Sequence, residues 1–146
     1  MKREEIPQEL GIARAWIAAF NAHNVAAIVP LYAPDAELND SGMKHARRGR
    51  QEIEQWFTTR FQSVRAIAYT PSSELVEGER VAITWTVSGY TPRLLGQRWL
   101  SRSFAVDGVS VFIVRNGLIV WQRGFYDHLV PVERALPLLR LLPSRM

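Results

Sequence analysis

The sequence predicts an α+β domain in which helices come first and a sheet follows. In residues 6–62 the apolar side chains recur at the three- and four-residue spacing of amphipathic helices. From Ala66 onward they alternate with polar residues, which is the spacing of strands with one buried face. Helices followed by a run of strands favour three helices packed on one face of a curved, mostly antiparallel sheet.

Three helices are expected before the sheet. The first has an apolar stripe with steps of four, three, four and three residues: Ile6, Leu10, Ala13, Ile17 and Phe20. Residues 21–24 end it, Asn24 is expected to cap a short second helix, and Pro30 is expected to bend or end that helix. The third carries Ile53, Trp56, Phe57 and Phe61 and ends near Gln62. A brief strand-like segment, residues 36–40, lies between the second and third helices.

Turn signals divide the strand region. Glu77-Gly78-Glu79 lies between two extended segments, residues 74–76 and 80–88, and predicts a hairpin. Its second arm should bury one face: Val81, Ile83, Trp85 and Val87. Asp107-Gly108 interrupts the extended segments 98–106 and 109–114, which indicates a bulge or a second hairpin.

The last strand is the most unusual stretch of the sequence. It follows the Asn116-Gly117 turn, is rich in aromatic residues and ends in a carboxylate. Regular alternation places five side chains on one face: Ile119, Trp121, Arg123, Phe125 and Asp127. An acid and a base among aromatic side chains predict the wall of a pocket rather than a solvent-facing surface.

Composition excludes several classes of function. The 146 residues suit one domain, residues 1–146, with ordinary apolar (47%) and charged (22%) fractions. The net charge is +4, but the basic residues do not form a stripe interleaved with exposed aromatic residues, so no nucleic-acid partner is expected. There are no cysteines, and the three histidines are scattered, so no metal is expected. No signal peptide and no apolar run of about 20 residues is present, which predicts a cytoplasmic protein without a membrane partner.

Several segments together resemble a known superfamily. They are residues 16–24 (WIAAFNAHN), 31–36 (LYAPDA), 49–53 (GRQEI) and 108–120 (GVSVFIVRNGLIV), followed by Tyr126-Asp127. Over residues 8–128 the chain resembles nuclear transport factor two-like proteins, and within them the SnoaL-like polyketide cyclases and limonene epoxide hydrolases. The resemblance implies a cone-shaped α+β roll. It specifies the activity much less closely, because proteins with this fold have many different activities.

The resemblance also implies site residues. Asp40 falls where ketosteroid isomerases of this superfamily keep their catalytic carboxylate, and Asp127 falls where the cyclases and epoxide hydrolases keep an acid. Trp16 occupies the region of the isomerases' tyrosine donor. Residues 85–87 (WTV) lack the Arg-x-Asp pair of the epoxide hydrolases, which argues against limonene-type hydrolysis.

These observations favour a cofactor-independent enzyme that performs acid–base chemistry of the isomerase or cyclase type on an apolar cyclic or polyketide-like carbonyl compound. Asp127 is expected to be the general acid/base and Asp40 the second carboxylate, with Arg123 and Trp16 stabilising negative charge. The expected substrate-binding residues are the aromatics Trp16, Phe20, Trp56, Phe57, Trp85, Trp121 and Phe125.

Other interpretations stay open on the sequence alone. Asp40 can equally cap the Asn-Asp-Ser-Gly turn, and Asp127 can pair with Arg123. The whole domain can be a non-catalytic binder of hydrophobic ligands, or an epoxide hydrolase with an altered set of acids. The resemblance further implies a homodimer, with contacts expected from Val120, Gln122, Gly124 and the leucine-rich segment 131–142.

Overall fold

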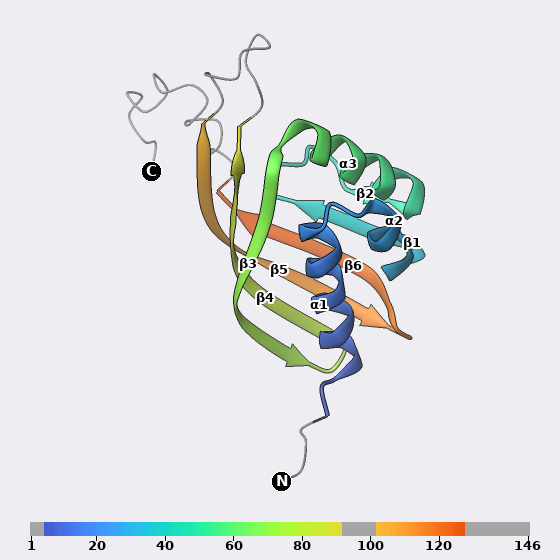
Figure 1. Ribbon diagram of the computed structural model, residues 1–146. Coiled ribbons are helices and arrows are strands. Elements are labelled where there is room, and N and C mark those ends of the chain that lie inside the picture. Colours follow the sequence, from blue (N-terminus) through green and yellow to red (C-terminus); the bar gives the residue numbers. More distant parts are fainter. Residues whose placement is uncertain (1–4, 92–101, 128–146) are drawn as a thin grey trace.

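The structure is a computed structural model that describes residues 5–91 and 102–127 (Figure 1). The leucine-rich segment 131–142, a predicted dimer contact, lies outside these ranges. The helical elements are α1 (Gln8–Asn21), α2 (Val25–Ile28), the 3-10 helix η1 (Val29–Leu31) and α3 (Gly49–Ser63). The strands are β1 (Tyr32–Asp40), β2 (Arg47–Arg48), β3 (Arg65–Glu77), β4 (Arg80–Tyr90), β5 (Ser103–Arg115) and β6 (Leu118–Tyr126).

The described strands form one mixed sheet in the order β2-β1-β6-β5-β4-β3. All neighbours are antiparallel except β1 and β6, which run parallel. Consequently β1 lies beside β6, although about 80 residues separate the two strands in sequence. This pairing brings the residues at the end of β1 next to those near the end of β6.

Helices α1 and α3 cover the same face of the curved sheet (Figure 1). Helix α1 packs against β3, β4 and β5, and α3 packs against β1 and β3. The two helices meet through aromatic rings, with Trp16 5.9 Å and Phe20 6.1 Å from Phe57 between ring centroids. The predicted α+β fold, with its helices on one face of a curved sheet, is therefore confirmed.

The predicted local signals of the helical half are largely confirmed. The stripe of α1 is buried from Leu10 to Phe20, whereas Ile6 precedes the helix and is 58% exposed. Asn24 caps α2, because its Oδ1 accepts a hydrogen bond from the Ala27 N–H at 3.0 Å. Pro30 lies in the 3-10 turn that ends this helical segment.

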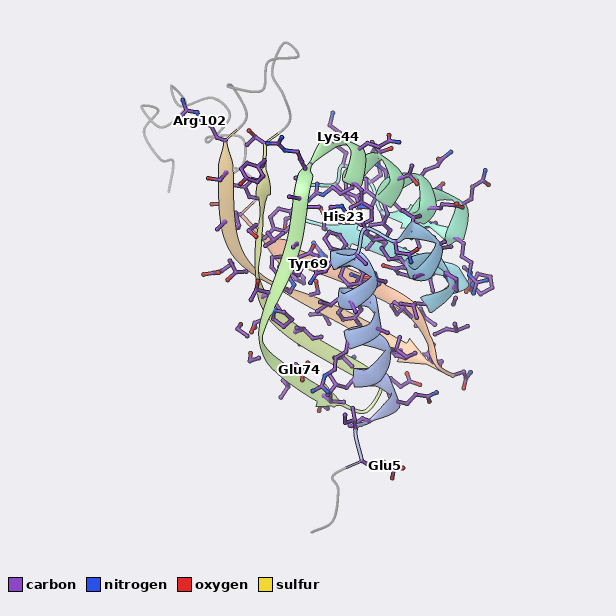
Figure 2. The ribbon with its side chains drawn as sticks, in the orientation of Figure 1. Glu5, His23, Lys44, Tyr69, Glu74 and Arg102 are labelled. Atoms are coloured by element: carbon purple, nitrogen blue, oxygen red, sulfur yellow. The ribbon has the colours of Figure 1, made fainter. Side chains whose placement is uncertain are left out.

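Polar side chains join α1 to β3. Arg14 and Glu74 form an ion pair at 2.6 Å, and the Asn21 amide bonds both the N–H and the C=O of Tyr69. His23, beyond the end of α1, bonds the Ile67 carbonyl oxygen at 2.7 Å. Figure 2 shows Tyr69 and Glu74 along β3 beside this helix. Together these contacts fix the position of α1 along β3 and hence the position of Trp16.

The hairpin and its buried face are also confirmed. β3 and β4 pair across the Glu77–Arg80 turn, and the predicted face of β4 is buried from Val81 to Val87. The interruption predicted at Asp107-Gly108 is wrong. β5 runs without a break from Ser103 to Arg115 and pairs regularly with β4 through Ile113. The glycine is needed for space instead, because the Trp85 ring lies over it.

Gly108→Ala is expected to destabilise the fold. A Cβ at this position lies 2.5 Å from both the Phe125 carbonyl oxygen and the Trp85 ring, so strand or ring must shift. Overpacking of this kind costs roughly 1–3 kcal/mol of unfolding free energy. Gly11→Ala is the matched control, since nothing lies within 4 Å of its Cβ in helix α1. It should stabilise by about 0.5–1 kcal/mol. Urea unfolding measures both, and equal stabilities of the two variants contradict the expectation.

A β-bulge in the last strand changes which side chains face the helices. Ile113 of β5 pairs with Trp121, while the next residue, Val114, pairs with Ile119, so Val120 is an extra residue in β6. Ile119 is buried before the bulge, and after it Gln122 and Gly124 are buried while Arg123 and Phe125 are exposed. The shared face predicted for residues 119–127 is therefore wrong beyond Ile119, because one extra residue reverses the alternation.

Candidate functional site

A small cavity lies between the helices and the sheet where β1, β6 and β5 are neighbours. The space in which the centre of a water molecule fits is about 20 Å³, enough for roughly one water. The lining residues come from both helices and four strands: Trp16, Phe20, Leu38, Asn39, Asp40, Trp56, Phe57, Arg60, Tyr69, Ser110, Gln122, Gly124 and Tyr126. These described lining residues form an aromatic enclosure and include one carboxylate, Asp40, and one guanidinium, Arg60.

The Asp40 carboxylate ends β1 at the edge of the cavity. Its Oδ1 accepts the Gly42 N–H at 2.7 Å, so the turn-capping interpretation is correct as far as this oxygen is concerned. The Tyr126 hydroxyl donates to the same oxygen at a longer 3.4 Å. Within the described residues no hydrogen bond reaches Oδ2, which leaves that oxygen for a ligand.

Tyr126 and Arg60 connect the carboxylate to a positive charge. The Arg60 Nη2 donates to the Tyr126 hydroxyl oxygen at 3.3 Å. Burial raises the pKa of the Tyr126 hydroxyl, and the Asp40 charge raises it further against the opposing effect of Arg60. Burial alone lowers the pKa of Arg60, but Tyr126, Tyr69 and Asp40 outweigh it and raise that pKa above its usual value. Tyr126 is therefore a proton donor and Arg60 a fixed cation at neutral pH.

Trp56 separates the cavity from a groove on the surface. Two guanidinium groups lie over its ring, with Arg47 at 5.2 Å and Arg60 at 5.5 Å from its centroid. The groove on its other side measures about 580 Å³ and is lined by His45, Ala46, Arg47, Glu52, Gln55, Trp56 and Thr59. The Trp56 side chain thus forms a wall shared by the cavity and the groove.

A buried chain of hydrogen bonds runs beneath the cavity. Trp16 Nε1 donates to the Tyr32 hydroxyl at 2.8 Å, and Tyr32 in turn donates to the Gln122 Oε1. On a separate branch, Trp85 Nε1 donates to the Ser110 Oγ at 2.9 Å. Burial raises the pKa of Tyr32 well above its ordinary value, and the Trp16 hydrogen bond only partly opposes this. Burial also raises the pKa of Tyr69.

These raised pKa values predict a loss of stability at alkaline pH. An unfolded tyrosine releases its proton near pH 10, whereas the folded chain retains the protons of Tyr32, Tyr69 and Tyr126 to higher pH. The contribution of these tyrosines to the unfolding free energy should therefore be constant below about pH 9 and fall above pH 10, by roughly 1.4 kcal/mol per pH unit for Tyr32. Urea titrations from pH 8 to 11.5 measure the slope. Tyr32→Phe should reduce it, and an unchanged slope contradicts this assignment.

The comparison with known families agrees with this architecture. Residues 13–122 match the family model described as a SnoaL-like domain. The chain belongs to the SnoaL-like domain family. No curated protein shows significant similarity to its sequence.

Solved structures with this SnoaL-like fold include three that cover most of the chain. A protein from Catenulispora acidiphila with a ketosteroid isomerase-like fold, in complex with trimethylamine, has 22% identity and a TM-score of 0.75, covering 85% of this chain and 91% of its own. A putative SnoaL-like polyketide cyclase from Shewanella putrefaciens has 16% identity and a TM-score of 0.77, covering 94% and 100%. An NTF2-like protein from Burkholderia thailandensis has 22% identity and a TM-score of 0.76, covering 90% and 100%.

The cavity of this SnoaL-like domain brings together only part of the predicted site. Asp40 lines it, as do Trp16, Phe20, Trp56 and Phe57. Trp85 is buried behind it, where its ring packs against Tyr69 at 4.5 Å. Four predicted residues do not line it, because the bulge turns them to the opposite face or leaves them beyond the strand end: Trp121, Arg123, Phe125 and Asp127. Arg123 instead lies over the Phe125 ring at 4.8 Å, and Asp127 is exposed.

Seven polar or small residues of the cavity are not among the predicted site residues: Asn39, Arg60, Tyr69, Ser110, Gln122, Gly124 and Tyr126. The prediction that Gln122 and Gly124 lie on a dimer-forming outer face is wrong, because both are buried on the inner face. The available signal was a glutamine and a glycine two residues apart in an otherwise bulky strand. A glycine inside a strand often marks a place where a ligand or another backbone approaches closely.

Two kinds of feature are absent from the described residues. No helix in residues 5–91 and 102–127 is long and apolar enough to cross a membrane. In the same ranges, no three histidine, aspartate or glutamate side chains come together as metal ligands would.

Proposed function

We propose that this SnoaL-like domain is a cofactor-independent enzyme that moves a proton on an apolar cyclic or polyketide-like carbonyl compound. The proposal depends on one observation: the Asp40 carboxylate lines an aromatic cavity with one oxygen held by Gly42 and the other free of protein donors among the described residues. A carboxylate held in this way is suited to act as a general base towards a bound carbon acid.

The reaction balances with the residues of the cavity. Asp40 Oδ2 takes a proton from the carbon next to the substrate carbonyl, and the C–H electron pair forms a carbon–carbon double bond while the carbonyl oxygen becomes negative. In a substrate with a carbon–carbon double bond next to the deprotonated carbon, the intermediate is a dienolate. The carboxylic acid returns the proton to the far (γ) carbon, the double bond moves into conjugation, the carbonyl re-forms and the carboxylate is regenerated. Trp16, Phe20 and Phe57 supply apolar walls for the substrate rings. Asp127 and Arg123 receive no role in this proposal, because they do not line the cavity.

The assay follows hydrogen exchange, since it needs no knowledge of the final product. The chain is incubated with a panel of cyclic ketones and 1,3-diketones in D₂O, and NMR measures deuterium uptake at the α-carbon. Exchange faster than in buffer alone, saturable in ketone, supports the proposal. Exchange at the buffer rate for every ketone that binds contradicts it.

A second function is favoured by the small size of the cavity. Room for about one water means that the aromatic side chains nearly fill the enclosure, as in a domain without catalysis. A domain filled by its own side chains would show neither saturable quenching of tryptophan fluorescence by hydrophobic ligands nor hydrogen exchange, whereas a non-catalytic ligand-binding domain would show saturable quenching without exchange. The solved relative from Catenulispora acidiphila is in complex with a small molecule, trimethylamine, so ligand binding to this fold is also consistent with this alternative.

A further inference from the structure

Hydrogen bonds around the cavity begin at a tryptophan, and this fixes their direction. An indole N–H donates but has no acceptor. Trp16 Nε1 donates to the Tyr32 oxygen at 2.8 Å, so the Tyr32 hydroxyl hydrogen is free for another partner. That partner is Gln122, which must present its carbonyl oxygen Oε1 to Tyr32. The opposite orientation of the amide would set two donors on Tyr32 and leave its buried hydrogen without an acceptor.

Because the Gln122 carbonyl oxygen faces Tyr32, its amide nitrogen Nε2 is the atom that can face the cavity. Gln122 lines the cavity and is only 2% exposed. Within residues 5–91 and 102–127, no group accepts a hydrogen bond from its Nε2. In that part of the chain, every side-chain nitrogen or oxygen that is sealed from water has a hydrogen-bond partner. Nε2 is therefore not sealed, and its N–H donors are open to the cavity.

A second tryptophan, Trp85, fixes the hydrogen-bond roles of Ser110 on β5, the strand that pairs with β6. Its Nε1 donates to the Ser110 Oγ at 2.9 Å, so the Ser110 hydroxyl has already used one acceptor position. Ser110 is 2% exposed and lines the cavity. None of the hydrogen bonds in the described part of the chain uses its hydroxyl hydrogen. Ser110 is therefore a second donor whose partner has to come from the cavity.

Gly124 leaves space between these donors and Asp40. It pairs with Asp40 of β1 on one side and with Ser110 of β5 on the other. Two strand spacings place the Asp40 and Ser110 backbones roughly 10 Å apart, and the β6 residue between them is a glycine without a side chain. A Cβ on Gly124 would lie 3.3 Å from the Asp40 Cβ. The glycine therefore keeps open the position where a ligand atom can contact both the acid and the donors.

We propose that Gln122 Nε2 and Ser110 Oγ form a binding site for a hydrogen-bond-accepting oxygen of the ligand, above Gly124 and across from Asp40. This inference rests on the proposed function, because the ligand oxygen is then the substrate carbonyl that gains negative charge during proton removal. Donors already aimed at that oxygen stabilise the charge as it develops. Arg60 on the cavity wall adds a positive charge that favours an anionic oxygen.

The donor pair also defines the class of ligand. A ketone, an enolate or a phenolate offers only acceptor positions at its oxygen, so it satisfies both donors. An ammonium or aromatic amine brings hydrogens towards hydrogens and leaves Gln122 and Ser110 unsatisfied. The site should therefore select enolisable ketones and their enolates over amines of the same shape, even though its aromatic walls by themselves would accept a cation.

The test measures binding rather than turnover, with 4-nitrophenolate as a stable mimic of an enolate. Absorbance titration of the full chain, at a pH where the probe is largely ionised, is compared with 4-nitroaniline and nitrobenzene. The phenolate should bind at least tenfold more tightly than the aniline. Gln122→Glu replaces the donor by an oxygen and should weaken phenolate binding at least tenfold, with less than a twofold effect on nitrobenzene. Ser110→Ala should weaken it about threefold.

Matched variants separate this inference from the proposed function. Gln62→Glu adds the same charge on an exposed position of α3 and should change phenolate binding less than twofold. Asp40→Asn should retain or improve phenolate binding while losing proton exchange. If Gln122→Glu does not fold, Ser110→Ala decides the outcome. Equal phenolate affinity in wild type and the donor variants, no phenolate binding at all, or tighter binding of trimethylammonium than of phenolate overturns the inference.

Discussion

Asp40→Asn is expected to lower the rate of α-proton exchange by about 10²–10⁴-fold, which is the usual contribution of a positioned general base. The substitution keeps the shape of the side chain. Its amide oxygen can still accept the Gly42 N–H, so the turn after β1 should survive. Only the basic oxygen that faces the substrate is lost. The unfolding free energy should therefore change little while the exchange rate collapses.

Two other aspartates make this experiment decisive. Asp35→Asn changes an exposed acid of the same strand and should leave the exchange rate within twofold of wild type. Asp127→Asn tests the acid that the sequence favoured. If Asp127→Asn abolishes exchange and Asp40→Asn preserves it, the assignment of the base to Asp40 is wrong. If both variants retain full exchange, neither carboxylate is the base.

Trp16→Ala is expected to lower the unfolding free energy by about 3–5 kcal/mol, because a fully buried indole is replaced by a methyl group. Trp16 is 2% exposed, and its ring lies 5.2 Å from Phe20 and 5.5 Å from Phe112. The substitution also removes the N–H that donates to Tyr32. Both the core and the hydrogen-bonded chain to Gln122 should therefore loosen.

Trp121→Ala is the matched control for this effect. Trp121 lies on the opposite face of β6 and is half-buried, so its loss should cost less than half as much. Trp16→Phe keeps an aromatic ring but removes the N–H that donates to Tyr32. It should lower the unfolding free energy by only about 1 kcal/mol if the hydrogen bond alone matters. Urea unfolding followed by circular dichroism measures all three. A loss below about 1 kcal/mol for Trp16→Ala contradicts the expected role of the indole.

The fold could be predicted from the sequence because its signals are local and repeated. The stripe from Leu10 to Phe20 specifies a helix at several positions, so one misassigned residue such as Ile6 does not alter the result. The hairpin at Gly78 and the buried face of β4 are specified in the same redundant way. Patterns of this kind depend only on which side chains must leave water.

The candidate site could be predicted only in part, because it depends on single residues. Asp40 and four aromatics were identified from their likeness to a family and from the apolar spacing of the helices. Arg60 sits one turn after Trp56, and nothing in its local sequence indicates that it reaches Tyr126 across the fold. Gln122 and Gly124 were placed on the wrong side because the extra residue Val120 has no signature of its own: it is an ordinary strand former.

The bulge at Val120 has a consequence for aligning this chain with its relatives. Before it the inward positions of β6 are odd-numbered, as at Ile119, and after it they are even-numbered, as at Gln122 and Gly124. A position-by-position alignment without a gap at this point shifts every later residue out of phase. Functional equivalences in the last strand should therefore be counted backwards from Tyr126, which lines the cavity, and not forwards from the Asn116-Gly117 turn.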